Sequence, residues 1–178
     1  MMLHDLKALV RTVPDFPKPG IQFRDITTLL ADPKGFRALV DVMSDVARPH
    51  AIDYVVGIEA RGFILGATVA AALGTGFVAV RKPGKLPGRT VGIDYALEYG
   101  TDRLELHEGQ IPANARVLLV DDLIATGGTA LAATQLLQDQ NAHVALALFA
   151  IDLPELGGIA ALNAGGVATH AIMAFDGH

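Results

Sequence analysis

Residues 116–129 read RVLLVDDLIATGGT. Residues 117–120 are a continuous apolar run, which is typical of a parallel strand covered on both faces. Asp121 and Asp122 follow this run directly, at the carboxyl end of the strand, where open α/β sheets bind their ligands. A short loop comes next, and a helix is predicted to begin near Thr129. The stretch therefore predicts an α/β fold with a ligand site at this edge of the sheet.

The loop that follows the two carboxylates suits a phosphate group. Gly127 and Gly128 let the backbone turn its N–H groups toward an anion, and the hydroxyls of Thr126 and Thr129 add donors. The positive end of the helix dipole acts at the same place. The other common phosphate loops, G-x-x-x-x-G-K-[ST] and a G-x-G-x-x-G that opens a helix, are absent. A turn that merely caps the helix is the alternative, and the adjacent carboxylates argue against it.

Composition limits the function further. A chain of 178 residues with 51% hydrophobic residues is expected to form one domain with a full core. The net charge of -5 argues against nucleic acid as a partner. Cysteine is absent, which excludes disulfides and thiol nucleophiles and fits a cytoplasmic location. The charged residues near the N-terminus leave no room for a signal-peptide core.

One segment is long and apolar enough to raise the question of a membrane span. Residues 62–80 carry no charge. Because Gly74-Thr75-Gly76 interrupts the segment, we expect a helix up to Leu73, a turn and a strand over residues 77–80 instead.

Strands and helices alternate along the chain, which predicts a mostly parallel central sheet flanked by helices. The predicted strands are residues 54–58, 77–80, 117–120, 144–151 and a last one near 168–174. The predicted helices are residues 3–13, one that begins after Asp32 as N-cap and Pro33 at N1, 63–73, 129–140 and a short one near 154–162. Residues 90–95 and 103–107 are predicted to be antiparallel strands that flank a mobile connection.

A second cluster of charge lies upstream of the phosphate loop. Between Ala60 and Ile93 there are five basic residues and no Asp or Glu: Arg61, Arg81, Lys82, Lys85 and Arg89. Proline and glycine mark residues 81–88 as a loop, which is suited to holding an anion through charge-assisted hydrogen bonds. A solvated basic surface loop is the alternative.

Four segments together carry a resemblance to a known family. Residues 117–129 resemble the phosphoribosyl-diphosphate binding motif of the type I phosphoribosyltransferases. FPKPGIQFRDIT at 16–27, GIEARGF at 57–63 and RKPGKLPG at 81–88 resemble signatures of the adenine branch of that family. The resemblance covers residues 4–175. It implies the fold of that family, with a mobile antiparallel lid and with residues 1–30 and about 150–165 as a hood on the purine side of a single domain, 1–178.

The resemblance also implies a reaction: adenine and phosphoribosyl diphosphate give AMP and diphosphate. The ribose and 5′-phosphate would be held by Asp121, Asp122, Ala125, Thr126, Gly127, Gly128 and Thr129. The diphosphate would be held by Arg61, Arg81, Lys82 and Lys85, and it would carry Mg²⁺ with no direct protein ligand. In this family the peptide at the site matching Glu59-Ala60 is often cis.

The purine side and the lid follow from the same resemblance. Phe23 would stack on adenine, the backbone of Gln22 and Arg24 would read its edge, and Leu153 would close the other side. The alternatives are that Phe23 is plain core and that Arg24 pairs with Asp25. Glu98 is the candidate catalytic acid/base and Tyr99 belongs to the lid, whereas an ordinary loop Glu is the alternative for Glu98.

Two other functions remain open at this point. One is a sister transferase for 6-oxopurines, and the other is a non-catalytic sensor of phosphoribosyl diphosphate. Residues 151–153, Ile-Asp-Leu, resemble the adenine branch, and the chain has no spare basic helix for a DNA-binding sensor. A homodimer in the cytoplasm is what the resemblance implies for the assembly. The six histidines lack metal-ligand spacing, and no role is assigned to them.

Overall fold

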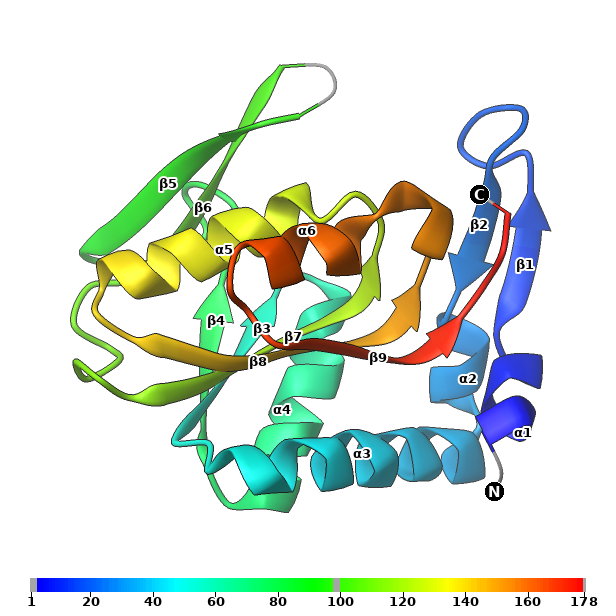
Figure 1. Ribbon diagram of the computed structural model, residues 1–178, viewed down its shortest axis with the longest axis horizontal. Helices are drawn as coiled ribbons and strands as arrows, with labels where there is room; N and C mark the ends of the chain where they lie inside the picture. The colour runs from blue at the N-terminus through cyan, green and yellow to red at the C-terminus, as the bar shows by residue number, and fades with distance from the viewer. Residues whose placement is uncertain (1–2, 98–99, 178) are drawn as a thin grey trace.

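The computed structural model describes residues 3–97 and 100–177, and a five-stranded parallel sheet forms its centre (Figure 1). The strand order is β4-β3-β7-β8-β9, and every neighbouring pair is parallel. The strands are β3 (Tyr54–Ile58), β4 (Gly76–Val80), β7 (Arg116–Ile124), β8 (His143–Asp152) and β9 (Thr169–Ala174). The predicted mostly parallel sheet is thus confirmed.

Side chains of β7 alternate between two hydrophobic cores, one on each face of the sheet. Val117 and Leu119 point into the first core, and Leu118 and Val120 point into the second, all of them fully buried. This is the burial on both faces that a continuous apolar run predicts. The core on each face is completed by flanking elements, so the sheet lies in the middle of a layered molecule (Figure 1).

Helices α5 (Gly128–Asp139) and α6 (Gly158–Ala164) cover one face of the sheet, and α3 (Pro33–Ala47) and α4 (Arg61–Leu73) cover the other (Figure 1). The N-cap prediction for α3 is confirmed, because the Asp32 side chain accepts a hydrogen bond of 2.7 Å from the Gly35 N–H. Two short 3₁₀ helices, η1 (Arg48–His50) and η2 (Pro154–Leu156), follow α3 and β8.

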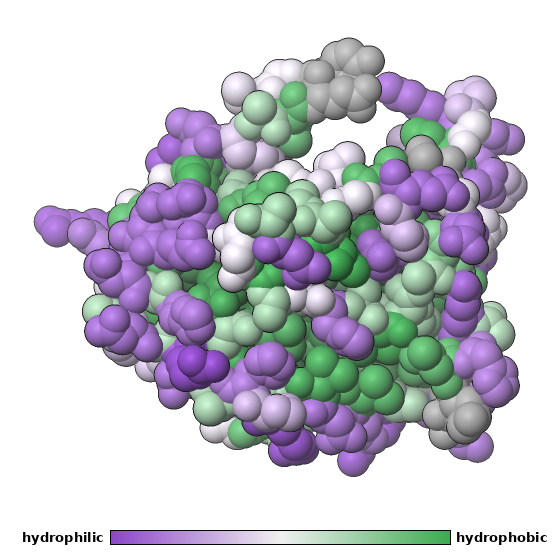
Figure 2. Space-filling model, in the orientation of Figure 1, coloured by the Kyte–Doolittle hydropathy of each residue, from purple (hydrophilic) through white to green (hydrophobic). Residues whose placement is uncertain are grey.

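Two antiparallel hairpins rise beyond the sheet. One consists of β5 (Thr90–Ala96) and β6 (Thr101–His107), as predicted, and its Leu104 and Leu106 are buried in the first core. The other consists of β1 (Arg11–Pro14) and β2 (Gln22–Asp25), which follow α1 (Leu3–Ala8) and precede α2 (Thr27–Ala31). Figure 2 shows the surface hollowed between these hairpins, with apolar residues exposed lower down, between β9 and α3.

Two predicted boundaries were wrong, and pairing with distant strands explains both. The first helix ends at Ala8 rather than residue 13, because residues 11–14 pair with β2. Strand β7 runs to Ile124, because β8 continues alongside it up to the pair Ile124 and Asp152. Asp121 and Asp122 therefore lie within the last part of the strand and not beyond its end.

The apolar segment at residues 62–80 divides as expected. It forms most of α4, a turn with Gly74 at φ 72°, and β4. Within residues 3–97 and 100–177, no helix is long and apolar enough to cross a membrane.

Candidate active site

The phosphate-loop candidate connects β7 to α5. Residues 125–127 form the turn, in which Gly127 has φ 88°, and α5 begins at Gly128. The first N–H groups of a helix have no partner inside the helix, so those of α5 are available to an anion. A positive φ of this size is why a glycine stands at position 127.

The same loop packs closely against the beginning of α6. A Cβ atom on Gly158 would lie 2.5 Å from the Ala125 carbonyl oxygen and 3.0 Å from the Gly127 nitrogen. The Gly158 N–H donates to the Ala125 carbonyl over 3.0 Å, and the Leu153 N–H donates to the Ile124 carbonyl over 3.1 Å. The backbone of the loop is thus held from behind, and its open side faces a cavity.

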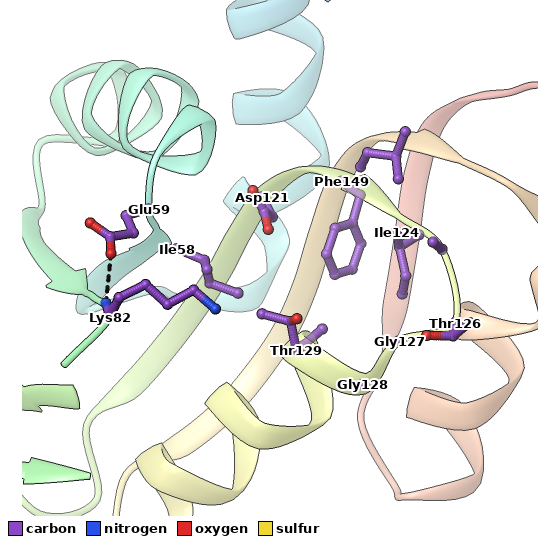
Figure 3. A pocket seen from close by; sticks show the side chains of 13 residues that line it. Ile58, Glu59, Lys82, Asp121, Ile124, Thr126, Gly127, Gly128, Thr129 and Phe149 are labelled. Atoms are coloured by element: carbon purple, nitrogen blue, oxygen red, sulfur yellow. Dashed lines mark hydrogen bonds between the residues drawn. The ribbon is translucent and has the colours of Figure 1, made fainter. Parts of the chain in front are cut away.

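This cavity, which we call the loop cavity, has a volume of about 250 Å³ (Figure 3). Its walls come from the carboxyl ends of β3 and β7, from Phe149 of β8, from Lys82, the second residue after β4, and from the phosphate loop. The lining residues are Ile58, Glu59, Lys82, Asp121, Leu123, Ile124, Ala125, Thr126, Gly127, Gly128, Thr129, Ala130 and Phe149. The predicted meeting of the phosphate loop with Asp121 and with one of the basic residues is therefore present in the fold.

The two adjacent carboxylates of β7 differ in their surroundings. Asp121 lines the loop cavity, and burial, together with the neighbouring Asp122, raises the pKa of its carboxyl well above the ordinary value. The buried Asp122 instead accepts a hydrogen bond from Nε of Arg61, the first residue of α4. Partial burial of Arg61 disfavours its charged guanidinium, but the Asp122 carboxylate outweighs this effect, and the pKa of Arg61 is raised.

Helix α4 reaches β7 so closely because Gly62 has no side chain. A Cβ atom there would lie 2.8 Å from the Val120 carbonyl oxygen and 3.0 Å from Oδ1 of Asp121. The glycine thereby allows Arg61 to approach the carboxylates of β7.

Glu59 anchors two of the basic residues that follow β4. One of its oxygens accepts from the Lys82 backbone N–H at 2.7 Å, and the other accepts from Nε of Arg81 at 2.9 Å (Figure 3 draws the first of these bonds). Burial acts against the charged carboxylate, but these hydrogen bonds keep the pKa of Glu59 below its ordinary value. The peptide bond Glu59-Ala60 is cis, as expected.

The Lys82 side chain connects the loop cavity to the β5–β6 hairpin. Its ammonium group donates to Tyr95 Oη over 3.1 Å and forms an ion pair with Asp102. The Tyr95 hydroxyl lies 3.4 Å from the Thr129 hydroxyl at the beginning of α5. Partial burial opposes the charge on Lys82, yet Asp102 and Tyr95 raise its pKa, and Lys82 in turn lowers the pKa of Asp102.

A second cavity, of about 320 Å³, lies at the β1–β2 hairpin. We call it the Phe23 cavity. Phe23 meets Phe16 edge to face, with 5.3 Å between ring centroids. The lining residues are Arg11, Val13, Phe16, Phe23, Arg24, Asp25, Ile26, Thr27 and Arg61. Arg61 thus lines the Phe23 cavity while its guanidinium bonds a carboxylate of β7.

The structure places the remaining candidates as follows. Gln22 lies on β2 beside Phe23, Leu153 is buried after β8, and Lys85 lies in the loop after β4, where its carbonyl accepts from Arg81. Glu98 and Tyr99 lie outside the described residues. Phe23 lines a cavity and is only partly buried, so it is not plain core filler.

The suggested pair of Arg24 with Asp25 is wrong. Asp25 accepts from Arg11 and Thr27, whereas the Arg24 guanidinium donates to Thr12 and to carbonyl oxygens at the C-terminus. The two side chains leave β2 on opposite faces, as neighbours in a strand do.

The sequence arguments missed two charged groups of the site. Glu59 follows β3, and the rule that drew attention to Asp121 at the end of β7 applies to it equally. Asp102 carries no comparable signal, because only the pairing of the hairpin with the rest of the fold brings it to Lys82.

Comparison with known proteins agrees with this geometry. The phosphoribosyl transferase domain family matches residues 25–155. The chain therefore belongs to the phosphoribosyltransferases. The adenine phosphoribosyltransferase of Novosphingobium aromaticivorans is 60% identical to it over 178 residues, which is 100% of both chains. At this similarity the chain falls among the adenine phosphoribosyltransferases, which are pentosyltransferases of purine salvage.

Solved structures support the same assignment. The adenine phosphoribosyltransferase of Thermoanaerobacter pseudethanolicus superimposes with a TM-score of 0.93 at 41% identity, covering 98% of this chain and 100% of that one. The enzyme from Saccharomyces cerevisiae, solved with an imino-altritol bisphosphate and adenine, gives 0.89 at 39% identity, covering 96% and 98%.

Proposed function

We propose that the chain makes AMP and diphosphate from adenine and phosphoribosyl diphosphate across the loop cavity and the Phe23 cavity. The observation that carries this proposal is the position of Arg61. It lines the Phe23 cavity, and it bonds Asp122 on the strand that opens into the loop cavity. A substrate with its base in one cavity and its 5′-phosphate in the other would then have its reacting carbon between them.

The 5′-phosphate is assigned to the phosphate loop. The N–H groups at the beginning of α5 and the hydroxyls of Thr126 and Thr129 would receive it, within the cavity that all these residues line. The ribose hydroxyls are assigned to Asp121 and Asp122. A neutral Asp121 can donate a hydrogen bond to a hydroxyl oxygen, and an ionised one can accept, so its raised pKa is compatible with this contact.

The diphosphate is assigned to Arg61, Arg81, Lys82 and Lys85. As the bond to the anomeric carbon breaks, negative charge builds on the departing oxygens, so cations at this position favour the transition state over the ground state. A purine nitrogen takes the place of the diphosphate on the opposite face of the ribose, which inverts the configuration at that carbon.

Adenine is assigned to the Phe23 cavity. Phe23 would stack on the ring, and the backbone of Gln22 and Arg24 would read its edge. Leu153 would close the other side; this assignment rests on the resemblance, because Leu153 is not among the residues that line the Phe23 cavity. By resemblance, Glu98 would exchange a proton with the purine as acid/base, a role typically worth roughly 10²–10⁴ in rate. Tyr99 and the β5–β6 hairpin would form the lid that excludes water.

Mg²⁺ is expected to arrive with the diphosphate. Among the described residues, no three or more His, Cys, Asp or Glu gather as a metal site. A magnesium ion that is bound by the phosphate oxygens of the substrate and by water needs no such cluster, and we propose that the diphosphate carries the ion with no direct protein ligand. When bound, the ion would neutralise charge on the leaving group.

The resemblance also supports two proposals on the whole assembly. Residues 1–178 would act as a single catalytic domain, with residues 1–30 and about 150–165 as its purine-side hood. The enzyme would be a cytoplasmic homodimer, which light scattering coupled to gel filtration would test directly.

The deciding experiment measures AMP formation from adenine and phosphoribosyl diphosphate with Mg²⁺, with hypoxanthine and guanine in parallel. We expect turnover of adenine alone and loss of turnover with EDTA. Turnover of another base would overturn the adenine assignment.

Asp121→Asn tests the ribose assignment. Because the NH2 group of asparagine can only donate where a carboxyl oxygen can accept from a ribose hydroxyl, we expect the KM for phosphoribosyl diphosphate to rise about tenfold or more. Asp139→Asn, at the far end of α5, serves as the control. An unchanged KM would remove Asp121 from the ribose site.

A further inference from the structure

The Arg24 side chain ties β2 to the C-terminal segment of the chain. One of its terminal nitrogens donates to the carbonyl oxygens of Asp176 and Gly177, over 2.7 and 2.9 Å. The guanidinium also lies over the Phe175 ring, 5.0 Å from its centroid. The other terminal nitrogen donates to Thr12 on β1 over 2.6 Å. Arg24 thus holds together both strands of the hairpin and residues 175–177, which we call the C-terminal brace.

The C-terminal brace also forms hydrogen bonds to the residues around Leu153. The Phe175 N–H donates to the Asp152 carbonyl over 3.0 Å, and the Gly177 N–H donates to Oε1 of Glu155 over 3.2 Å. Leu153 lies between these two acceptors in the chain. The brace therefore contacts the residues immediately before and close after it.

Phe175 fixes the brace to the body of the molecule. Its side chain is buried in the second core, and the Lys7 ammonium of α1 lies 4.7 Å from the ring centroid. A segment anchored in this way can transmit its position to both elements that it touches.

We propose that the C-terminal brace sets the spacing between the two walls of the adenine site, with Arg24 as its positioning residue. This inference rests on the proposed function, in which Phe23 and Leu153 flank the base. Arg24 is next to Phe23 in the sequence. The other hydrogen bonds of the brace are to Asp152 and Glu155, which lie on either side of Leu153 in the sequence. A planar ring held between two side chains is sensitive to their separation, and a displacement of about 1 Å can cost about 100-fold in rate.

The test compares Arg24→Ala and Arg24→Lys with Arg37→Ala, an exposed arginine of α3 whose partner is Asp41. The backbone of residue 24 remains in every variant, so a loss reports on the side chain. We expect Arg24→Ala to raise the KM for adenine about tenfold and to leave the KM for phosphoribosyl diphosphate and the Tm nearly unchanged. Arg24→Lys keeps a cation beside Phe175 and should recover part of the loss.

A second arm removes residues 176–178, which deletes both carbonyl acceptors of Arg24. If the side chain acts through the brace, the truncation raises the KM for adenine, and adding Arg24→Ala to it has little further effect. Fully additive effects would overturn the proposal. So would equal increases in the KM of both substrates, which a general loss of structure would cause.

Phe23→Ala separates this inference from the proposed function. If Phe23→Ala leaves the KM for adenine unchanged, the adenine site is assigned wrongly and the inference fails with it. If Phe23→Ala raises that KM and Arg24→Ala does not, only the brace is wrong.

Discussion

Asp25 is an example of a single side chain that organises its surroundings. Its Oδ1 accepts from the Thr27 hydroxyl over 2.6 Å and from the Thr27 N–H over 2.9 Å, and its Oδ2 accepts from Arg11. These hydrogen bonds, with that from the Thr27 hydroxyl the largest contribution, lower the pKa of Asp25 to about 2. The ionised carboxylate joins β1 to the beginning of α2, beside the Phe23 cavity.

A pH dependence follows from this carboxylate. Because the pKa of Asp25 is lower in the folded state than its ordinary value of 3.8, the stabilisation is complete above about pH 4 and is lost as the pH falls toward 2. Asp25→Asn should therefore lower the Tm at pH 7 by about 5 °C and flatten its fall between pH 4 and 2. Thermal unfolding followed by circular dichroism measures both.

The control is Asp41→Asn, which removes an exposed ion pair on α3 and should change the Tm little. If Asp25→Asn keeps the wild-type pH profile below pH 4, another group carries the acid sensitivity.

At the scale of elements, the proposed diphosphate site implies that the β5–β6 hairpin competes with the substrate for a cation. Asp102 of β6 and Tyr95 of β5 hold the Lys82 ammonium, which we assign to the diphosphate. Glu59 holds Arg81 in the same way. Arg81 and Lys82 are thus paired within the protein, and on the proposed assignment a diphosphate has to replace these partners as it binds.

Asp102→Asn tests this competition. It leaves the side chain nearly the same size and removes the charge that holds Lys82, so we expect the inhibition constant of diphosphate to fall several-fold. Product inhibition measured at fixed adenine gives the constant. Asp94→Asn, which loses only an exposed partner of Arg103 on the same hairpin, is the matched control. Weaker diphosphate binding in Asp102→Asn would contradict the competition and would mean that Asp102 instead orients Lys82 toward the diphosphate.

For the molecule as a whole, the central sheet was predictable and the hairpin at residues 11–25 was not. Apolar runs such as residues 117–120 need no partner to be recognised, because a strand buried on both faces excludes polar residues throughout. Residues 11–14 form a strand only because β2 folds back beside them. A pairing of this kind is set by tertiary contacts, and the β-branched Thr12 and Val13 suit a strand once the partner strand lies beside them.

In the candidate site, too, the features set by neighbouring residues were predictable and those set by tertiary contacts were not. Its phosphate loop follows from local residue types, since glycines and threonines after a strand have a direct geometric use. The pairing of Arg61 with Asp122 and of Lys82 with Asp102 joins residues that are 61 and 20 positions apart. Charge alone does not tell which carboxylate meets which cation, so the sequence predicted the cations but not the partners that hold them.

The residues that line the two cavities come from segments between residues 11 and 149, so a ligand that fills both cavities should stabilise most of the fold. We expect AMP to raise the Tm more than equal concentrations of adenine and ribose 5-phosphate together, because binding one end raises the effective concentration of the other. Differential scanning fluorimetry at matched concentrations makes the comparison. An equal shift from the separate pieces would mean that the cavities do not hold one molecule.

The close contact between Gly158 and the phosphate loop has a consequence for the thermodynamics of binding. Because α6 already supports the backbone of residues 125–127 from behind, the loop has little conformational freedom left to lose when an anion arrives. Affinity for the 5′-phosphate that we assign to this loop would then not be reduced by an ordering cost, as it would be for a flexible glycine-rich loop. The conformational entropy of the loop backbone is lost during folding, so the loop already has its binding conformation before any anion arrives.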